Sequence, residues 1–271
     1  MKMGEEKKET NTKTTIDAIT GLAKAIPVYQ DAVQPAAQQI GKSLGTVTKA
    51  VNIALAPVKA LVWGYEKIED YLTKRVSEKL KDVPKEDIET PPTHIAGPAV
   101  ESLRYTGNNE NLRELYASLL AMSMNKKTTN KAHPSFVEVI KNLSTEEAII
   151  LQQFISENAF PKVDVQEPGK YNNGQRDLLI NFTSFHKMDT RININNTRTS
   201  LDNLQRLGVI QILKDEYFVN ESQYEPLEND PELTELKETI EKKGKKVKFR
   251  RGIIRLTAFG NDFVQNVVAM K

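Results

Sequence analysis

The stretch Thr93–Met124, THIAGPAVESLRYTGNNENLRELYASLLAMSM, determines how the chain folds. It holds a Gly97–Pro98 break and a turn signal at Gly107, followed by a long apolar run. Asn108 or Asn109 can cap a helix, because a short polar side chain accepts a hydrogen bond from a free N–H group of the first turn. The apolar residues recur every three or four positions, as one buried helix face does, at Leu112, Leu115, Leu119 and Met122. The stretch therefore predicts a turn and a buried helix, with no reaction centre.

The segment before this helix has a helical pattern from Thr15 to about Leu80. Its apolar residues step by three or four, at Ile40, Leu44, Val47, Val51, Leu55, Val58 and Leu61. We predict a disordered tail at residues 1–14 and a helical domain at residues 15–140, with a proline-rich linker at Val83–Pro98. An alternative is a helix pair that lies on, or inserts into, a membrane. A helix bundle is favoured, because amphipathic faces usually pack against a protein core.

The character of the chain changes near residue 143. Ser144 and Glu147 form a capping box before an apolar run, which predicts a helix start. We then predict a loop at Asn158–Gln175, a segment ambiguous between strand and short helix at Arg176–Met188, and a helix at Asn196–Gly208. The remaining segments predict a strand, turn and strand at Val209–Val219, a helix at Asn229–Gly244 with Asp230 as its cap, a strand at Val247–Leu256, and a closing helix capped by Thr257.

This order of elements resembles a winged helix-turn-helix whose wing has grown to hold an extra helix. The predicted fold class is therefore mainly α with a small β component. An N-terminal helical assembly is followed by a winged-helix-like domain at residues 141–271, with an enlarged, helix-containing wing.

Three blocks together resemble a known family. The first is Pro98–Met124, and the second is Ala132–Leu151 (AHPSFVEVIKNLSTEEAIIL). The third is a C-terminal block that begins with LDNLQRLGVI at Leu201 and ends with IIRLTAFGNDFV at Val264. These blocks are similar to the bacterial Abi-alpha family, a domain of unknown function associated with abortive infection. The resemblance runs from about Ile26 to the C-terminus. It implies an intracellular bacterial protein that resists phage, and it implies no particular reaction.

Composition excludes several classes of chemistry. The chain has 271 residues, a net charge of +2 and no cysteine. The family's closing helix often has a cysteine near its end, so a cysteine-dependent activity is excluded for this chain. Disulfides and cysteine-based metal sites are excluded with it. No secretory signal pattern begins the chain, so we expect a cytoplasmic protein.

No motif of catalysis or cofactor binding is evident. The segment Ala36–Ser43, AAQQIGKS, lacks the first glycine and the preceding strand of a phosphate-binding loop. His94, His133 and His186 have no second ligand at metal spacing. We predict structural roles for all three, and we expect no cofactor, no metal and no small-molecule substrate. An enzyme whose site assembles from distant segments stays open as an alternative.

The most distinctive local feature of the sequence is a basic run, KKGKKVKFRR, at residues 242–251. Its candidate nucleic-acid-binding residues are Lys242, Lys243, Lys245, Lys246, Lys248, Phe249, Arg250 and Arg251. Cations in a wing bind the phosphate backbone independently of base sequence, and an aromatic side chain can stack on a base. Alternatively, the lysines complement a helix C-terminus and the acidic stretch before them folds back on the run.

We therefore expect a phage-defence protein that acts by binding. The winged domain would sense nucleic acid or a phage protein, and the helical half would be the effector or the interface of a homo-oligomer. A membrane-acting effector is the alternative reading of the N-terminal helices.

Overall fold

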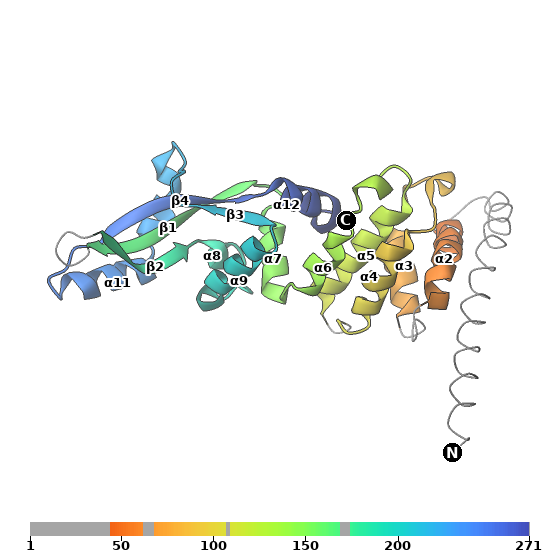
Figure 1. The fold of residues 1–271 in the computed structure, drawn as a ribbon, viewed down its shortest axis with the longest axis horizontal. Coiled ribbons are helices and arrows are strands. Elements are labelled where there is room, and N and C mark those ends of the chain that lie inside the picture. Colours follow the sequence, from red (N-terminus) through yellow and green to blue (C-terminus); the bar gives the residue numbers. More distant parts are fainter. Residues whose placement is uncertain (1–43, 62–67, 107–108, 169–173, 271) are drawn as a thin grey trace, which may run out of the picture.

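The computed structural model describes residues 44–61, 68–106, 109–168 and 174–270. Helices gather at one end of an elongated molecule and a four-stranded antiparallel sheet extends to the other (Figure 1). The fold is mainly helical with a small sheet, as predicted. The predicted tail, the segment Ala36–Ser43 and the helical pattern before residue 44 lie outside the described residues.

The helical part is built around α5 (Glu110–Met124). Every residue from Leu115 to Met124 is buried, because α5 is surrounded by neighbouring helices. These neighbours are α3 (Glu69–Lys79), α4 (Thr93–Leu103), α6 (Ser135–Lys141) and α7 (Thr145–Gln153), with α2 (Leu44–Leu61) packed on α3 and α4. Asn109 caps α5 by accepting a hydrogen bond from the N–H of Leu112, so the predicted cap and buried helix are confirmed, while the turn predicted at Gly107 lies outside the described residues. None of the described helices has the length and apolar character that a membrane crossing needs.

The predicted linker at Val83–Pro98 is wrong from Thr93 onward. Helix α4 begins at Thr93 and contains Pro98. Proline removes one helical hydrogen bond, the one that would reach the carbonyl of His94. His94 and Pro98 are both exposed, so water can satisfy that carbonyl. The opposite face of α4 buries Ile95, Ala99 and Leu103 against the core.

The sheet has the strand order β2-β1-β4-β3. Its strands are β1 (Ala159–Pro168), β2 (Gln175–Phe182), β3 (Ile210–Leu213) and β4 (Lys248–Leu256). The loop predicted at Asn158–Gln175 is wrong, because most of it is β1, one of the two inner strands. Pro161 is tolerated there since β1 pairs only with β4 at that position and meets β2 only from Val163 onward.

The helices of the sheet half mostly follow the prediction. Arg176–Met188 contains both β2 and a short helix, α8 (Phe185–Met188), and is followed by α9 (Ile194–Arg206). Between β3 and β4 lie α10 (Glu225–Glu228) and α11 (Pro231–Glu241), and Asp230 caps α11 as predicted. Thr257 caps α12 (Ala258–Phe263), which continues as a π-helical turn at Val264–Val268. The second strand predicted near Val219 does not form, because Phe218 packs on Tyr224 instead.

Two apolar clusters hold the molecule together. The larger one is continuous from α2 through α7 to the base of the sheet, where α12 and its π-turn contribute Phe263, Val264 and Val267. The smaller one lies under the far end of the sheet and joins Val163, Val165, Phe182, Tyr224, Leu227 and Leu233. This second cluster attaches α10 and α11 to the sheet.

The predicted capping box at the start of α7 is confirmed. The Ser144 Oγ accepts a hydrogen bond from the Glu147 N–H at 3.1 Å, and the Glu147 carboxylate accepts one from the Ser144 N–H at 2.7 Å. We expect Ser144→Ala to lower the free energy of unfolding by about 1 kcal/mol, measured by urea denaturation. Ser156→Ala removes an exposed hydroxyl outside any helix and should change nothing. Equal losses for the two variants would contradict the capping role.

Candidate nucleic-acid interface

The basic run lies at the tip of the sheet, where α11 ends and β4 begins (Figure 1). Lys242 is the C-cap of α11, and Gly244 follows with a φ of +72°. Glycine adopts this left-handed conformation without strain, so it ends the helix and turns the chain back toward β4. The run therefore consists of a helix end, a tight turn and the first residues of a strand.

Three cations of the run form ion pairs with other segments of the protein, and of these Lys245 is still exposed. The Lys245 Nζ lies 2.8 Å from the Glu167 carboxylate, and the Arg250 guanidinium lies 2.8 Å from that of Asp164. Arg251 contacts two acidic residues, Glu228 at 2.7 Å and Glu221 at 2.8 Å, and its guanidinium also covers the Tyr224 ring. The acidic stretch before the run thus folds back on Arg251, as the alternative interpretation expected. Phe249 is half-buried against the smaller apolar cluster.

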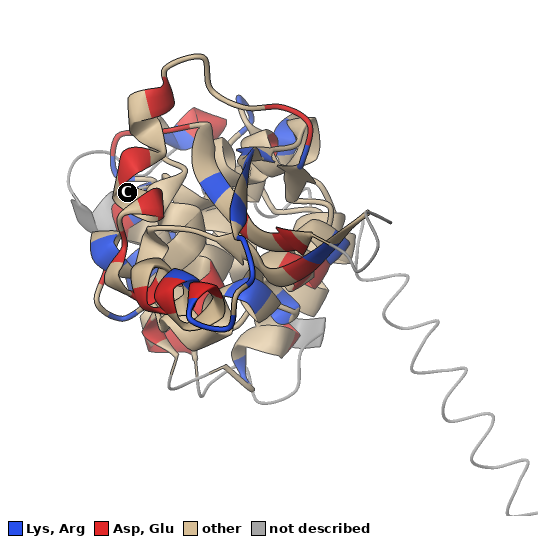
Figure 2. Ribbon diagram, turned by 90° about the vertical axis from the view of Figure 1, so that its left-hand side faces the viewer, with Lys and Arg blue, Asp and Glu red and all other residues tan. Residues whose placement is uncertain are grey.

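The other lysines point into solvent. Lys243, Lys246 and Lys248 are exposed and make no ion pair with any described residue. Lys242 is exposed too and lies 3.6 Å from Glu238 on the same helix. Figure 2 looks at this end of the molecule and shows the basic turn beside the acidic residues of α11. We call Lys243, Lys246 and Lys248 the tip lysines.

A buried ionic cluster fixes β4 beneath the tip. The side chains of Lys162 and Asp164 are 0% exposed, and the Lys162 Nζ donates to both Asp164 oxygens at 2.7 and 2.6 Å. The same carboxylate accepts hydrogen bonds from Arg250 at 3.0 and 2.8 Å and from the Asn181 N–H at 2.8 Å. Asp164 therefore ties together β1, β2 and β4.

Asp164 stays ionised in this environment. Burial acts to raise its pKa, but the hydrogen bonds from Lys162, Asn181 and Arg250 outweigh burial and hold the pKa below its usual value. Because its oxygens are occupied by these donors, the carboxylate is suited to holding structure rather than to proton transfer.

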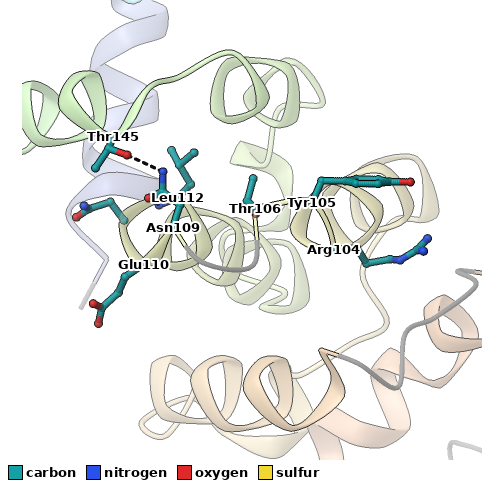
Figure 3. A pocket seen from close by; sticks show the side chains of 8 residues that line it. Arg104, Tyr105, Thr106, Asn109, Glu110, Leu112 and Thr145 are labelled. Carbon is teal, nitrogen blue, oxygen red and sulfur yellow. Dashed lines mark hydrogen bonds between the residues drawn. The ribbon is translucent and has the colours of Figure 1, made fainter.

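A surface hollow lies elsewhere, near the end of α4 and the start of α5 (Figure 3). Its volume is about 810 Å³, and it is lined by Arg104, Tyr105, Thr106, Asn109, Glu110, Asn111, Leu112 and Thr145. The Asn109 side-chain amide donates to the Thr145 Oγ1 at 2.7 Å across one edge. His94 and His133 are not among the lining residues.

The three histidines lie on separate elements. His94 is exposed on the first turn of α4, and His133 is exposed before α6, where its Nδ1 accepts a hydrogen bond from the Ser135 N–H at 3.1 Å. His186 is half-buried beside the Phe182 ring. In the part of the chain that the structure describes, no three His, Asp or Glu side chains lie close enough together to hold a metal ion.

The comparisons with known proteins agree with the sequence blocks. The family model described as abortive infection alpha matches residues 64–267. A solved structure of an uncharacterized protein from the hydrocarbon-degrading marine bacterium Alcanivorax borkumensis SK2 is similar at 16% identity, over 48% of this chain and 89% of that chain, with a TM-score of 0.34. Curated proteins give no match. Since the family match covers most of the sequence and includes all three blocks, the chain belongs to the abortive infection alpha family.

Proposed function

We propose that this chain is a phage-defence protein that acts by binding, and that its sheet half contacts nucleic acid through the tip lysines. The family suggests the abortive-infection role. The observation that supports nucleic-acid contact is that Lys243, Lys246 and Lys248 are exposed at one tip without an ion partner among the described residues. Lysines of this kind release counterions from a phosphate backbone without reading its bases.

The arrangement of the sheet half supports a winged-helix-like interpretation. In a winged helix the last strand lies between the strand that precedes the helix-turn-helix and the strand that follows it. Here β4 lies between β1 and β3 in the same way, with α8 and α9 between β1 and β3 in the sequence. β2 is an additional edge strand, and residues 214–247 form the enlarged wing. The tip lysines lie where the returning strand of this wing begins.

The position of the tip lysines leaves other roles for the remaining residues of the basic run and for the helical half. Lys245, Arg250 and Arg251 stabilise the wing through their internal ion pairs, so they position the tip rather than contact phosphates. Phe249 likewise packs inside the wing. The helical half is then the effector or the interface of a homo-oligomer.

Replacing all three tip lysines by alanine should weaken nucleic-acid binding and reduce its salt dependence. Each phosphate contact contributes about 0.9 to the slope of log affinity against log salt concentration on duplex DNA, so the slope should fall by up to about 2.7. The measurement is fluorescence anisotropy of the full chain with a labelled random-sequence duplex, between about 50 and 200 mM salt.

The matched control removes three exposed lysines from the helical half, Lys81, Lys131 and Lys141. It changes the net charge equally and should leave the slope unaltered. Equal effects of the two triple variants would show that only total charge matters. Wild-type protein that does not bind the duplex at low salt would refute the proposal.

A further inference from the structure

Helix α9 has one buried face and one polar, exposed face. Thr197, Ser200, Leu201 and Leu204 pack inward. At helical spacing on the other side lie five exposed polar residues, Asn195, Arg198, Thr199, Asp202 and Gln205. We call these five residues the reading face.

The side chains of the reading face do not bond α9 to any other described part of the protein. None of the five makes a hydrogen bond or an ion pair within the described residues. Its neighbours on the same helix differ. Asn196 donates to Glu146 at 3.4 Å, and Asn203 donates to the Glu147 carboxylate at 2.9 Å. The bonded residues attach α9 to α7, and the reading face is left with unused donors and acceptors.

We propose that α9 enters the major groove of duplex DNA and that its reading face contacts base edges; this inference rests on the proposed nucleic-acid binding. The residue types suit such contacts. Arginine pairs with guanine, asparagine and glutamine pair with adenine, and threonine reaches either purine. The short helix α8 precedes α9, as the first helix precedes the recognition helix of a helix-turn-helix. The exposed side of α9 has two positive residues, Arg198 and Arg206, and one negative residue, Asp202. Its net charge is therefore positive and complements phosphates.

The shape of the element favours DNA over RNA. An α-helix is about 10–12 Å wide, which matches the roughly 12 Å major groove of B-form DNA. The major groove of A-form RNA is too narrow for side chains to read. The 13 residues of α9 supply more than three turns for such a contact.

The acidic helix α11 limits the direction from which DNA can approach α9. Glu232 lines a small cavity together with Asn195 and Arg198, and Glu235 is exposed farther along α11. These carboxylates repel phosphates, so the phosphate backbone of the duplex must run on the side of α9 away from α11.

The test is sequence selection by the full chain from a library of random duplexes about 20 base pairs long, two helical turns of DNA. Wild-type protein should enrich a defined sequence. Arg198→Ala should relax the preference at one base pair by a factor of about 5 to 100, while the salt slope falls by no more than about one. Thr199→Ala should relax a neighbouring position. The matched control is Lys237→Ala, which removes an exposed cation from α11 and should leave the selected sequence unchanged.

Three outcomes would overturn the inference while leaving nucleic-acid binding intact. In the first, wild-type protein binds with a salt slope that depends on the tip lysines but enriches no sequence. In the second, the α9 variants select the same sequence as wild type. In the third, an RNA duplex competes equally and loses affinity through the same α9 variants. Absence of all duplex binding would instead refute the proposed function itself.

Discussion

Replacing Asp164 by alanine is expected to lower the free energy of unfolding by roughly 3–5 kcal/mol, the usual cost of removing one partner of a buried ion pair. The change leaves the ammonium of Lys162 buried at 0% exposure with no carboxylate beside it. It also removes the acceptor that serves Arg250 and the Asn181 N–H. Chemical denaturation of the full chain measures the loss.

A double variant separates charge pairing from packing. Replacing Lys162 by methionine and Asp164 by leucine removes both charges and keeps similar volume. Buried ion pairs replaced in this way are often neutral or stabilising, so the double variant should recover much of the loss. If it is as unstable as Asp164→Ala, the cost arises from the bonds to Arg250 and Asn181 instead.

The same carboxylate gives the protein a dependence on pH. Its folded-state pKa is lower than the unfolded value of about 3.9. Its contribution to stability is therefore complete above the unfolded pKa and is lost as the pH falls through the folded pKa. The free energy of unfolding of the wild-type protein should decrease as the pH falls below about 4. The Asp164→Asn variant should lack the part of this decrease that Asp164 causes.

Replacing Gly260 by alanine is expected to destabilise the protein by about 3 kcal/mol or more, at the upper end of the cost of overpacking. A Cβ atom at this position would lie 1.8 Å from the backbone oxygen of Val209. Backbone cannot move aside as a flexible side chain can. Helix α12 would have to move away from Val209, and Phe263 and Val267 would leave the main core.

Gly97→Ala is the matched control for this variant. Gly97 lies inside α4, and an added Cβ would meet no atom within 4 Å other than those of its chain neighbours and its own helix backbone. Alanine favours helix over glycine by about 1 kcal/mol, which offsets the crowding between its Cβ and the Pro98 ring, so this variant should be close to neutral. Thermal unfolding of both variants distinguishes the steric effect at Gly260 from a general effect of removing glycine. A Gly260→Ala protein as stable as wild type would contradict the close approach.

The helical part was predictable because its signals are local. The leucine spacing on α5, the Ser144–Glu147 capping box and the Asp230–Pro231 start of α11 each depend on a few neighbouring residues. The inner strand β1 was missed because it has four charged or amide side chains and two prolines among its ten residues. Lys162 and Asp164 alternate with Val163 and Val165, which is a strand pattern, but Pro161 and Pro168 favour a loop.

The candidate interface was predictable as a cluster but not residue by residue. Seven basic residues in a row of ten are visible in the sequence. Which of them form ion pairs depends on Asp164 and Glu167, which strand pairing brings beside Arg250 and Lys245 from far away in the chain. The reading face of α9 had a local signal, since its polar residues recur at helical spacing. That signal gains meaning only when the buried side of the helix is known.

The measurement that tests the account most directly is lysine labelling of the full chain with and without a DNA duplex at low salt, with each site quantified by mass spectrometry. The account predicts that the duplex protects Lys243, Lys246 and Lys248, while the exposed Lys81, Lys131 and Lys141 of the helical half react as before. Protection of the helical-half lysines alone, or of no lysine while the duplex is bound, would contradict it.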